Sequence, residues 1–278
     1  MDYAHPELIA EPDWLAEHLH DADVRVVDCA ILEAYRRAHI TGAVHLSAHY
    51  YVKEDDPDGT DHGVLVMPPR QFEALMSKLG VGPETTVVAY DDNNGFLAAR
   101  LWWVLNYYGH TKARVLNGGW HRWFSEGRPT TFHATRVAPA AFKAAEPRSD
   151  IYASCEMLLE KHDQPGWQVF DARTDAEWEG TNDRGNRRAG HVPNARHLEW
   201  AKFVSTDDRR SLLPADDIQG LLAEAGFTRD RQTITYCQGG IRAAHAAFVL
   251  ALMGYDRVRV YDGSMREWAN RDDTPLVK

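Results

Sequence analysis

The chain has 278 residues, of which 44% are hydrophobic and 26% are charged, and nine are Trp. This composition excludes a disordered chain and predicts a globular protein with a sizeable core and room for two domains. The formal net charge of −10 argues against nucleic acid or an anionic membrane surface as the main partner.

The three cysteines, Cys29, Cys155 and Cys237, are few, odd in number and widely spaced. This usage predicts a reducing compartment and no disulfide framework, and no Cys/His spacing typical of zinc occurs. The N-terminal stretch 1–19 is acidic and has no long apolar run, so we expect neither a signal peptide nor a transit peptide. No apolar run reaches the roughly 18 residues of a membrane span. We therefore expect a cytoplasmic protein without a metal or cofactor.

The predicted elements come in the same order in both halves of the chain. Each half has an amphipathic helix, a strand that ends in Asp, and a His-containing turn that leads to a short strand. A second helix, a core strand, a loop, a long apolar helix and a last strand before a Gly turn follow. In the first half the helices and strands with clear limits are 13–20, 24–28, 69–79, 86–90 and 113–116. In the second half they are 155–161 behind a Ser154 cap, 167–171, 215–225, 233–236 and 257–261.

Self-comparison shows that the halves are a duplication. A shift of 145 residues places 92–123 on 237–268 without a gap, and ten of these 32 positions are identical. A shift of 152 places 39–46 on 191–198, and a shift of 143 places 26–28 on 169–171. The differing shifts indicate changes in loop length, mostly the polar insertion at 179–188.

Alternating strands and helices predict an α/β fold with a parallel sheet and helices on both faces in each half. The stretch 127–150 is rich in Ala, Pro and Thr and has no long periodic run, which predicts a linker. We therefore expect a first domain at 1–130, a linker at 131–149 and a second domain at 150–278.

Cys237 stands directly after the core strand of the second half and before Gly239, Gly240 and an Ala-rich helix. In α/β sheets ligands bind beyond the carboxyl ends of the strands, where backbone N–H groups and the helix dipole favour an anion. Arg242 adds a positive charge five residues after Cys237. These surroundings lower a thiol pKa and predict a nucleophilic thiolate. The alternative is a small buried Cys beside a turn.

The matching loop of the first half carries carboxylates instead of a thiol. The ungapped shift pairs Asp92 with Cys237, and a slip of one residue would pair Asp91. A carboxylate cannot carry a transferable sulfur, so we expect the first half to be non-catalytic and to form one wall of the site. The alternative for both aspartates is a solvated turn.

Two tandem halves, a Cys loop in the second half, and the strings HVPNA, CQGGIRAA and YDGSMREW resemble the tandem-domain rhodanese family of sulfurtransferases. The resemblance covers nearly the whole chain and implies two rhodanese domains, each with a five-stranded parallel sheet. It implies that Cys237 forms a persulfide, and we expect the backbone of Gln238, Gly239, Gly240, Ile241 and Arg242 to surround it.

The chain departs from the family in its donor contacts. Gln238 and Gly239 match neither the Arg-Lys of members that prefer thiosulfate nor the Ser or Thr of members that prefer mercaptopyruvate. Glu177 stands where both subtypes have a substrate-binding Arg. Arg187 and Arg188 could supply the missing anion site, and the alternative is a solvated loop. By the resemblance Phe96 matches an aromatic residue that lines the cleft, although a core or interface Phe is the simpler interpretation.

Other residues are assigned mainly structural roles. Arg173 completes the family pattern D-x-R with Asp171, and we expect an ion pair more than a ligand contact. His39 and His191 occupy equivalent turns, so a structural hydrogen bond is expected of both. His245 is expected to pack within its helix.

The sequence thus predicts a sulfurtransferase that takes sulfur from a small anionic donor, thiosulfate before 3-mercaptopyruvate, and passes it to cyanide, a thiol or a protein. A Cys-dependent phosphatase or arsenate reductase is a rival, but only four residues separate Cys237 from Arg242, one fewer than in C-x5-R. A non-catalytic sulfur carrier or binding module is the third alternative.

Overall fold

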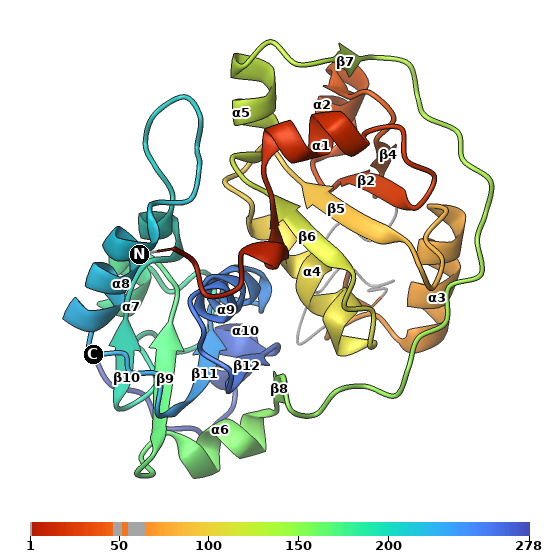
Figure 1. Ribbon diagram of the computed structural model, residues 1–278. Coiled ribbons are helices and arrows are strands. Elements are labelled where there is room, and N and C mark those ends of the chain that lie inside the picture. The colour runs from red at the N-terminus through yellow and green to blue at the C-terminus, as the bar shows by residue number, and fades with distance from the viewer. Residues whose placement is uncertain (1, 47–51, 55–64) are drawn as a thin grey trace.

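Each half of the chain is built on a five-stranded parallel sheet with helices on both faces (Figure 1). The computed structural model describes residues 2–46, 52–54 and 65–278; the predicted first domain also includes 47–51 and 55–64, which lie outside the described residues. The first sheet has the order β1 (Ile9–Ala10), β6 (Ala113–Leu116), β5 (Thr86–Tyr90), β2 (Val24–Asp28) and β4 (Val44–His45). The second has the order β10 (Ala195–His197), β9 (Trp167–Asp171), β11 (Gln232–Tyr236), β12 (Val258–Tyr261) and β8 (Tyr152–Ala153). The predicted α/β fold with two five-stranded parallel sheets is confirmed.

The helices follow the same duplication. The first half contains α1 (Pro12–His18), α2 (Leu32–Arg37), α3 (Pro69–Lys78), α4 (Phe96–Tyr107) and α5 (Gly119–Ser125), after a 3-10 turn, η1 (Pro6–Leu8). The second contains α6 (Cys155–Lys161), α7 (Asp175–Trp178), α8 (Ala215–Glu224), α9 (Ile241–Leu252) and α10 (Ser264–Trp268), with the 3-10 turn η2 (Trp200–Phe203). Ser154 caps α6 as predicted, since its side chain accepts a hydrogen bond from the Met157 N–H.

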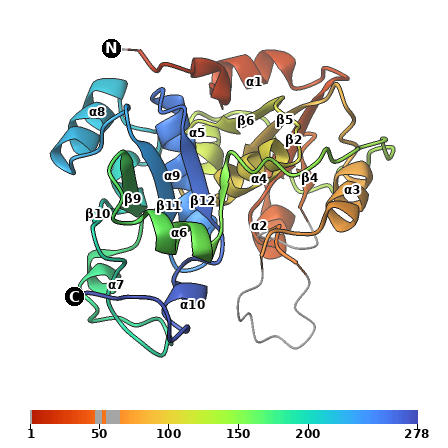
Figure 2. The same cartoon turned by 90° about the horizontal axis from the view of Figure 1, so that it is seen from below.

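The long apolar helices α4 and α9 join the two halves. They pack against each other between the two sheets (Figures 1 and 2), and the rings of Trp102 and Phe248 meet edge to face at 5.1 Å. Phe96 and Trp200 make a second aromatic contact at 5.1 Å. Because both helices bury residues over most of their length, their sequences carry little amphipathic pattern. One apolar core therefore runs through both halves.

The predicted linker lies against the first half. At its start β7 (Thr130–Thr131) pairs antiparallel with β3 (His39–Ile40). Further on, Ala140 N–H donates to the Ser77 carbonyl at 2.9 Å, and the Phe142 ring is only 3% exposed. This stretch of the chain is irregular but packed, so it is not a flexible tether.

Within the part of the chain that the structure describes, we find no helix with the length and hydrophobicity that crossing a membrane requires.

Candidate active site

Cys237 occupies the turn between the central strand β11 and helix α9 of the second half. The strand ends at Tyr236 and the helix begins at Ile241, so the first-turn N–H groups of α9 have no partners within the helix. The Ser264 hydroxyl accepts hydrogen bonds from the N–H groups of Cys237 and Gly240, both at 3.1 Å. The start of α10 therefore fixes the loop and leaves the thiol at the positive end of α9.

Gly240 is required in this loop for two reasons. Its φ of +82° lies in the left-handed region, which favours glycine. A Cβ atom at this position would also lie 2.3 Å from the Asp262 Oδ1 atom and 2.8 Å from the Asp262 carbonyl. A side chain at position 240 would therefore push the loop away from the Gly turn that follows β12.

The Cys237 side chain is only 1% exposed, yet it lines a pocket of about 290 Å³ between the two halves. The residues that line this pocket come from both halves: Lys53, Phe96, Arg184, Cys237, Gln238, Gly239, Ile241, Arg242 and Arg266. Four of these nine are Lys or Arg, and among the described residues no carboxylate lines the pocket. The pocket therefore concentrates positive charge around the sulfur, in a protein whose net charge is negative.

The first half supplies one wall of this pocket, as expected. Phe96, at the start of α4, lines the pocket and also contacts Trp200 of the second half, so it is an interface residue as well as a cleft residue. Lys53 also lines the pocket and was not predicted. Its Nζ atom lies 3.3 Å from Asp262 Oδ1, where Arg100 binds at 2.6 Å. Burial lowers the pKa of Lys53, although the charge of Asp262 opposes that change.

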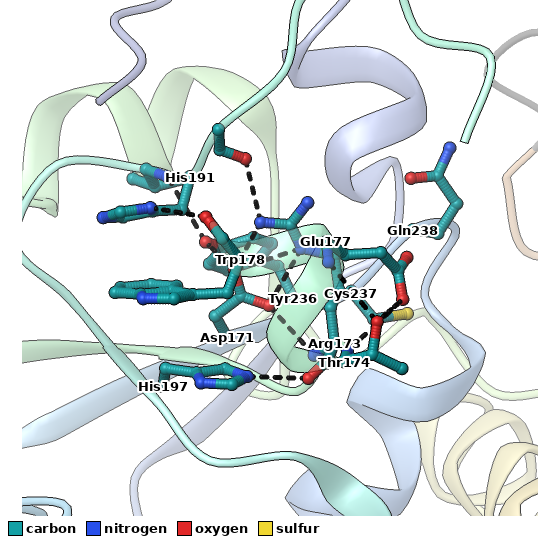
Figure 3. Close-up of polar contacts among 12 residues, drawn as sticks. Asp171, Arg173, Thr174, Glu177, Trp178, His191, His197, Tyr236, Cys237 and Gln238 are labelled. Carbon is teal, nitrogen blue, oxygen red and sulfur yellow. Dashed lines mark hydrogen bonds and ion pairs between the residues drawn. The ribbon is translucent and has the colours of Figure 1, made fainter. Parts of the chain in front are cut away.

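Glu177, which stands where the resemblance implies a donor-binding Arg, pairs with Arg242. The Nη1 and Nη2 atoms of Arg242 donate to the Glu177 carboxylate at 2.7 and 2.8 Å. Thr174 completes a capping box with Glu177 at the start of α7 (Figure 3). Burial raises the pKa of Glu177, but the hydrogen bonds and charge of Arg242 outweigh burial and lower it to about 2. Glu177 thus stays ionised and holds Arg242 at the loop.

Arg173 forms the expected ion pair with Asp171 and does not line the pocket. Its guanidinium donates to both oxygens of Asp171, with its Nη2 at 2.6 Å from Oδ2, and to the Gly190 carbonyl at 3.0 Å (Figure 3). The Tyr236 hydroxyl donates to the same carboxylate. This network joins the ends of β9 and β11 behind the Cys237 loop.

The structure does not bring Arg187 and Arg188 to the pocket, so the sequence-based interpretation of them as an anion site is corrected. Arg188 donates to carbonyls at the end of α10, among them Trp268 at 2.9 Å. Arg187 pairs with Asp272 at 2.9 Å. The end of a helix presents carbonyl oxygens, which attract such guanidinium groups. Arg184, from the same loop, reaches the pocket instead, and so does Arg266 of α10.

In the first half, the loop between β5 and α4 donates its backbone N–H groups to the side chain of Asp91. Strand β5 ends at Tyr90 as β11 ends at Tyr236, so Asp91 and not Asp92 is the counterpart of Cys237. The Asp91 side chain is 1% exposed, which rules out a solvated turn. Its carboxylate accepts four backbone N–H bonds of 2.7 to 2.9 Å, from Asn93, Gly95, Leu97 and Ala98. The carboxylate therefore occupies the anion position of its own loop.

His39, His191 and His245 are packed within the fold. His39 bonds the Tyr35 carbonyl at 2.7 Å and His191 the Trp178 carbonyl at 3.0 Å, and each ring stacks on that aromatic partner. Burial lowers the pKa of His245 to about 3, so this helix residue stays neutral.

Among the described residues, one group has metal-ligand atoms within 4.8 Å of one another: Cys155, Glu156 and Glu267. Arg271 pairs with both glutamates, at 3.0 and 3.5 Å. Burial raises the pKa of Cys155 to about 11, so its thiol keeps its proton. The group is an ion-pair cluster that is poorly suited to a metal ion.

A family model described as a rhodanese-like domain matches residues 11–126 and again 154–271. The chain is 35% identical to a sulfur carrier protein of Thermus thermophilus, over 100% of this chain and 99% of that protein. It is 34% identical to a thiosulfate sulfurtransferase of Azotobacter vinelandii, over 99% and 98% of the two chains. The crystal structure of a 3-mercaptopyruvate sulfurtransferase from Escherichia coli superposes with a TM-score of 0.81 at 26% identity, covering 92% of this chain and 98% of that one.

Proposed function

The chain belongs to the rhodanese family as a tandem-domain sulfurtransferase, and we propose that it transfers sulfur through a persulfide on Cys237. The sulfane sulfur would come from thiosulfate and pass to a thiophilic acceptor. Residues 150–278 would form the catalytic domain and residues 1–130 the supporting one, joined by 131–149. The observation that carries the proposal is the position of Cys237. Its sulfur lines a cationic pocket at the N-terminus of α9.

In the first step the Cys237 thiolate attacks the outer sulfur of thiosulfate. The S–S bond of the donor breaks, sulfite leaves with the electron pair, and Cys237 keeps the outer sulfur as a persulfide. In the second step cyanide or a thiolate attacks the terminal sulfur. The bond between the two sulfurs breaks and the Cys237 thiolate returns, which gives ping-pong kinetics.

The surroundings of Cys237 suit both anions of this cycle. The N–H groups of the first turn of α9, which have no partners within the helix, and the fixed charge of Arg242 would stabilise a thiolate or a persulfide. We assign the oxygens of the donor to Lys53, Arg184 and Arg266, which line the same pocket. These three cations would replace the Arg that the family has at position 177.

Thiosulfate is the favoured donor because the loop offers no hydroxyl at Gly239 for the carboxylate of mercaptopyruvate. 3-Mercaptopyruvate remains the alternative donor, given the similarity to the Escherichia coli enzyme. Initial rates with the two donors at equal concentration test this choice, and a higher kcat/KM with 3-mercaptopyruvate would reverse it.

A protein is a second candidate for the acceptor. The Thermus thermophilus relative, which is named a sulfur carrier protein, covers this whole chain. Incubating the persulfidated chain with a cell extract tests this idea, because labelled sulfur would move to a protein band only if such an acceptor exists.

Phosphate-ester hydrolysis is the weaker alternative. Four residues separate Cys237 from Arg242, and the N–H groups of Cys237 and Gly240 are bound to Ser264. Both features leave a smaller ring of donors than a tetrahedral phosphate needs. Hydrolysis of p-nitrophenyl phosphate that disappears in Cys237→Ser would revive this alternative.

A further inference from the structure

The first half has a pocket of about 160 Å³ that the sulfurtransferase chemistry does not use. Residues that line it include Asp28, Ala30, Ala38, Tyr90, Asp92 and Phe124. The Asp28 carboxylate is 2% exposed and lies at the end of β2. The duplication shows what such a pocket is shaped to hold.

In the second half the corresponding space is filled by the side chain of Arg173. Its guanidinium binds both oxygens of Asp171 and the Gly190 carbonyl. Its central carbon lies 5.6 Å from the centre of the Tyr236 ring. The guanidinium therefore has three neighbours: a carboxylate, a carbonyl and an aromatic ring.

Hydrogen bonds fix the correspondence between the halves. The Tyr90 hydroxyl donates to Asp28 as that of Tyr236 donates to Asp171. The N–H of Ala30 donates to Asp28 at 2.8 Å, and the N–H of Arg173 to Asp171 at 3.0 Å.

Two histidines give an independent check. His45 contacts the Ala30 carbonyl at 2.9 Å, and His197 contacts the Arg173 carbonyl at 2.8 Å. Ala30 thus stands where Arg173 stands. Since His39 matches His191, Ala38 stands where Gly190 stands.

Every neighbour of the Arg173 guanidinium consequently has its counterpart in the wall of the first-half pocket. Asp28, Ala38 and Tyr90 all line it, and Ala30 leaves open the space that an arginine side chain would fill. The pocket therefore has the same three kinds of group that surround the guanidinium of Arg173, while the chain has alanine at position 30.

A second carboxylate and an exposed aromatic ring in the lining of the pocket also suit a guanidinium ligand. Asp92 adds a second carboxylate, and Phe124 is 60% exposed with its ring 5.3 Å from the Trp120 ring. Aromatic faces attract planar cations. Burial raises the pKa of Asp28 to about 7, and a bound cation would favour its ionised form. Arg37 also lines the pocket, and its positive charge would oppose the binding of a cation.

We propose that the first half binds a small guanidinium compound in this pocket, with Asp28 as its carboxylate partner and the Phe124 face at the mouth. The guanidinium would donate hydrogen bonds to the Asp28 carboxylate as the Arg173 guanidinium donates to Asp171. The ligand is a guanidinium carried on a short alkyl chain, of which an arginine side chain from another protein is the second source.

Calorimetric titration of the full chain with methylguanidinium chloride tests the proposal, with urea as the neutral planar control. We expect saturable binding of methylguanidinium and none of urea. Asp28→Asn should weaken binding at least tenfold, and Arg37→Gln should strengthen it. Absence of saturable binding in both the wild type and Arg37→Gln would overturn the proposal.

Ala30→Arg is the decisive variant, because it supplies the missing side chain as the second half does. It should abolish methylguanidinium binding, raise the melting temperature and leave sulfur transfer at Cys237 unchanged. Undiminished binding in a folded Ala30→Arg chain would overturn the proposal. Free L-arginine and an acetylated Gly-Arg-Gly amide separate the two sources, since tighter binding of the peptide indicates a protein side chain.

Discussion

Glu177 accepts hydrogen bonds from Nη1 and Nη2 of Arg242, at 2.7 and 2.8 Å, next to the loop that carries Cys237. Where the resemblance implies a donor-binding arginine, this chain thus has an acid that holds the loop arginine. Arg242 is thus held by a bidentate pair, and the proposed function assigns the oxygens of the donor to Lys53, Arg184 and Arg266, which line the same pocket.

Glu177→Gln should destabilise the chain by about 1–3 kcal/mol, because Arg242 would lose its buried counter-charge. The folded pKa of Glu177 is lowered to about 2 from a usual 4.5. The stability that the pair contributes is therefore present above about pH 4.5 and is lost as the pH falls toward 2. Urea unfolding of both chains across this range measures the difference, which should shrink on acidification. A difference that stays constant with pH would contradict the assignment.

Lys53→Met should raise KM for thiosulfate about tenfold or more, since hydrogen bonds to charged groups contribute ~1.5–3 kcal/mol. Because the pKa of Lys53 is lowered by burial, its charge is lost earlier as the pH rises. The wild-type KM should therefore rise at alkaline pH, and the KM of Lys53→Met should not. Arg187→Ala is the matched control, because that side chain lies outside the pocket, and its KM should be unchanged.

Gly240→Ala should lower kcat/KM by more than tenfold and also lower the melting temperature. The new Cβ would meet Asp262 at 2.3 Å, and the φ of +82° is unfavourable for alanine. Gly239→Ala is the matched control for the fold, since its Cβ would meet only the flexible end of Arg266 at 3.5 Å. Its melting temperature should change little, and equal losses of melting temperature in both variants would show that the loop is not held as described.

Asp91→Asn should cost about 1–3 kcal/mol of unfolding free energy, because the amide NH₂ would face backbone N–H groups that now donate to a carboxylate oxygen. Asp92→Asn is the control and should stay within about 0.5 kcal/mol, as surface substitutions usually do. Sulfur transfer should survive in both variants. Loss of transfer in a folded Asp91→Asn chain would show that the first loop takes part in catalysis.

The sequence predicts those elements whose pattern lies within a few consecutive residues. The strands that end at Asp28, Tyr90, Asp171 and Tyr236 have the predicted ends, because buried parallel strands are continuous apolar runs. The edge strands β1 and β8 were missed, since a strand of two residues has no period to detect.

Long-range contacts could not be predicted in the same way. Lys53 lies far from Cys237 in the chain and outside the matched repeats, so only the packing of the halves brings the two together. Arg184, Arg187 and Arg188 share one polar loop, and the path of its backbone decides which of them reaches the pocket. The salt bridge from Glu177 to Arg242 also depends on that tertiary path.

If Cys237 carries the transferred sulfur, thiosulfate alone must leave that sulfur on the chain. Intact-mass spectrometry of the native chain after incubation with thiosulfate measures this. We expect a gain of about 32 Da, one sulfur atom, which is absent in Cys237→Ser and is removed by cyanide. An unchanged mass in a wild-type chain with a reduced thiol, or the same gain in Cys237→Ser, would show that Cys237 does not carry the sulfur.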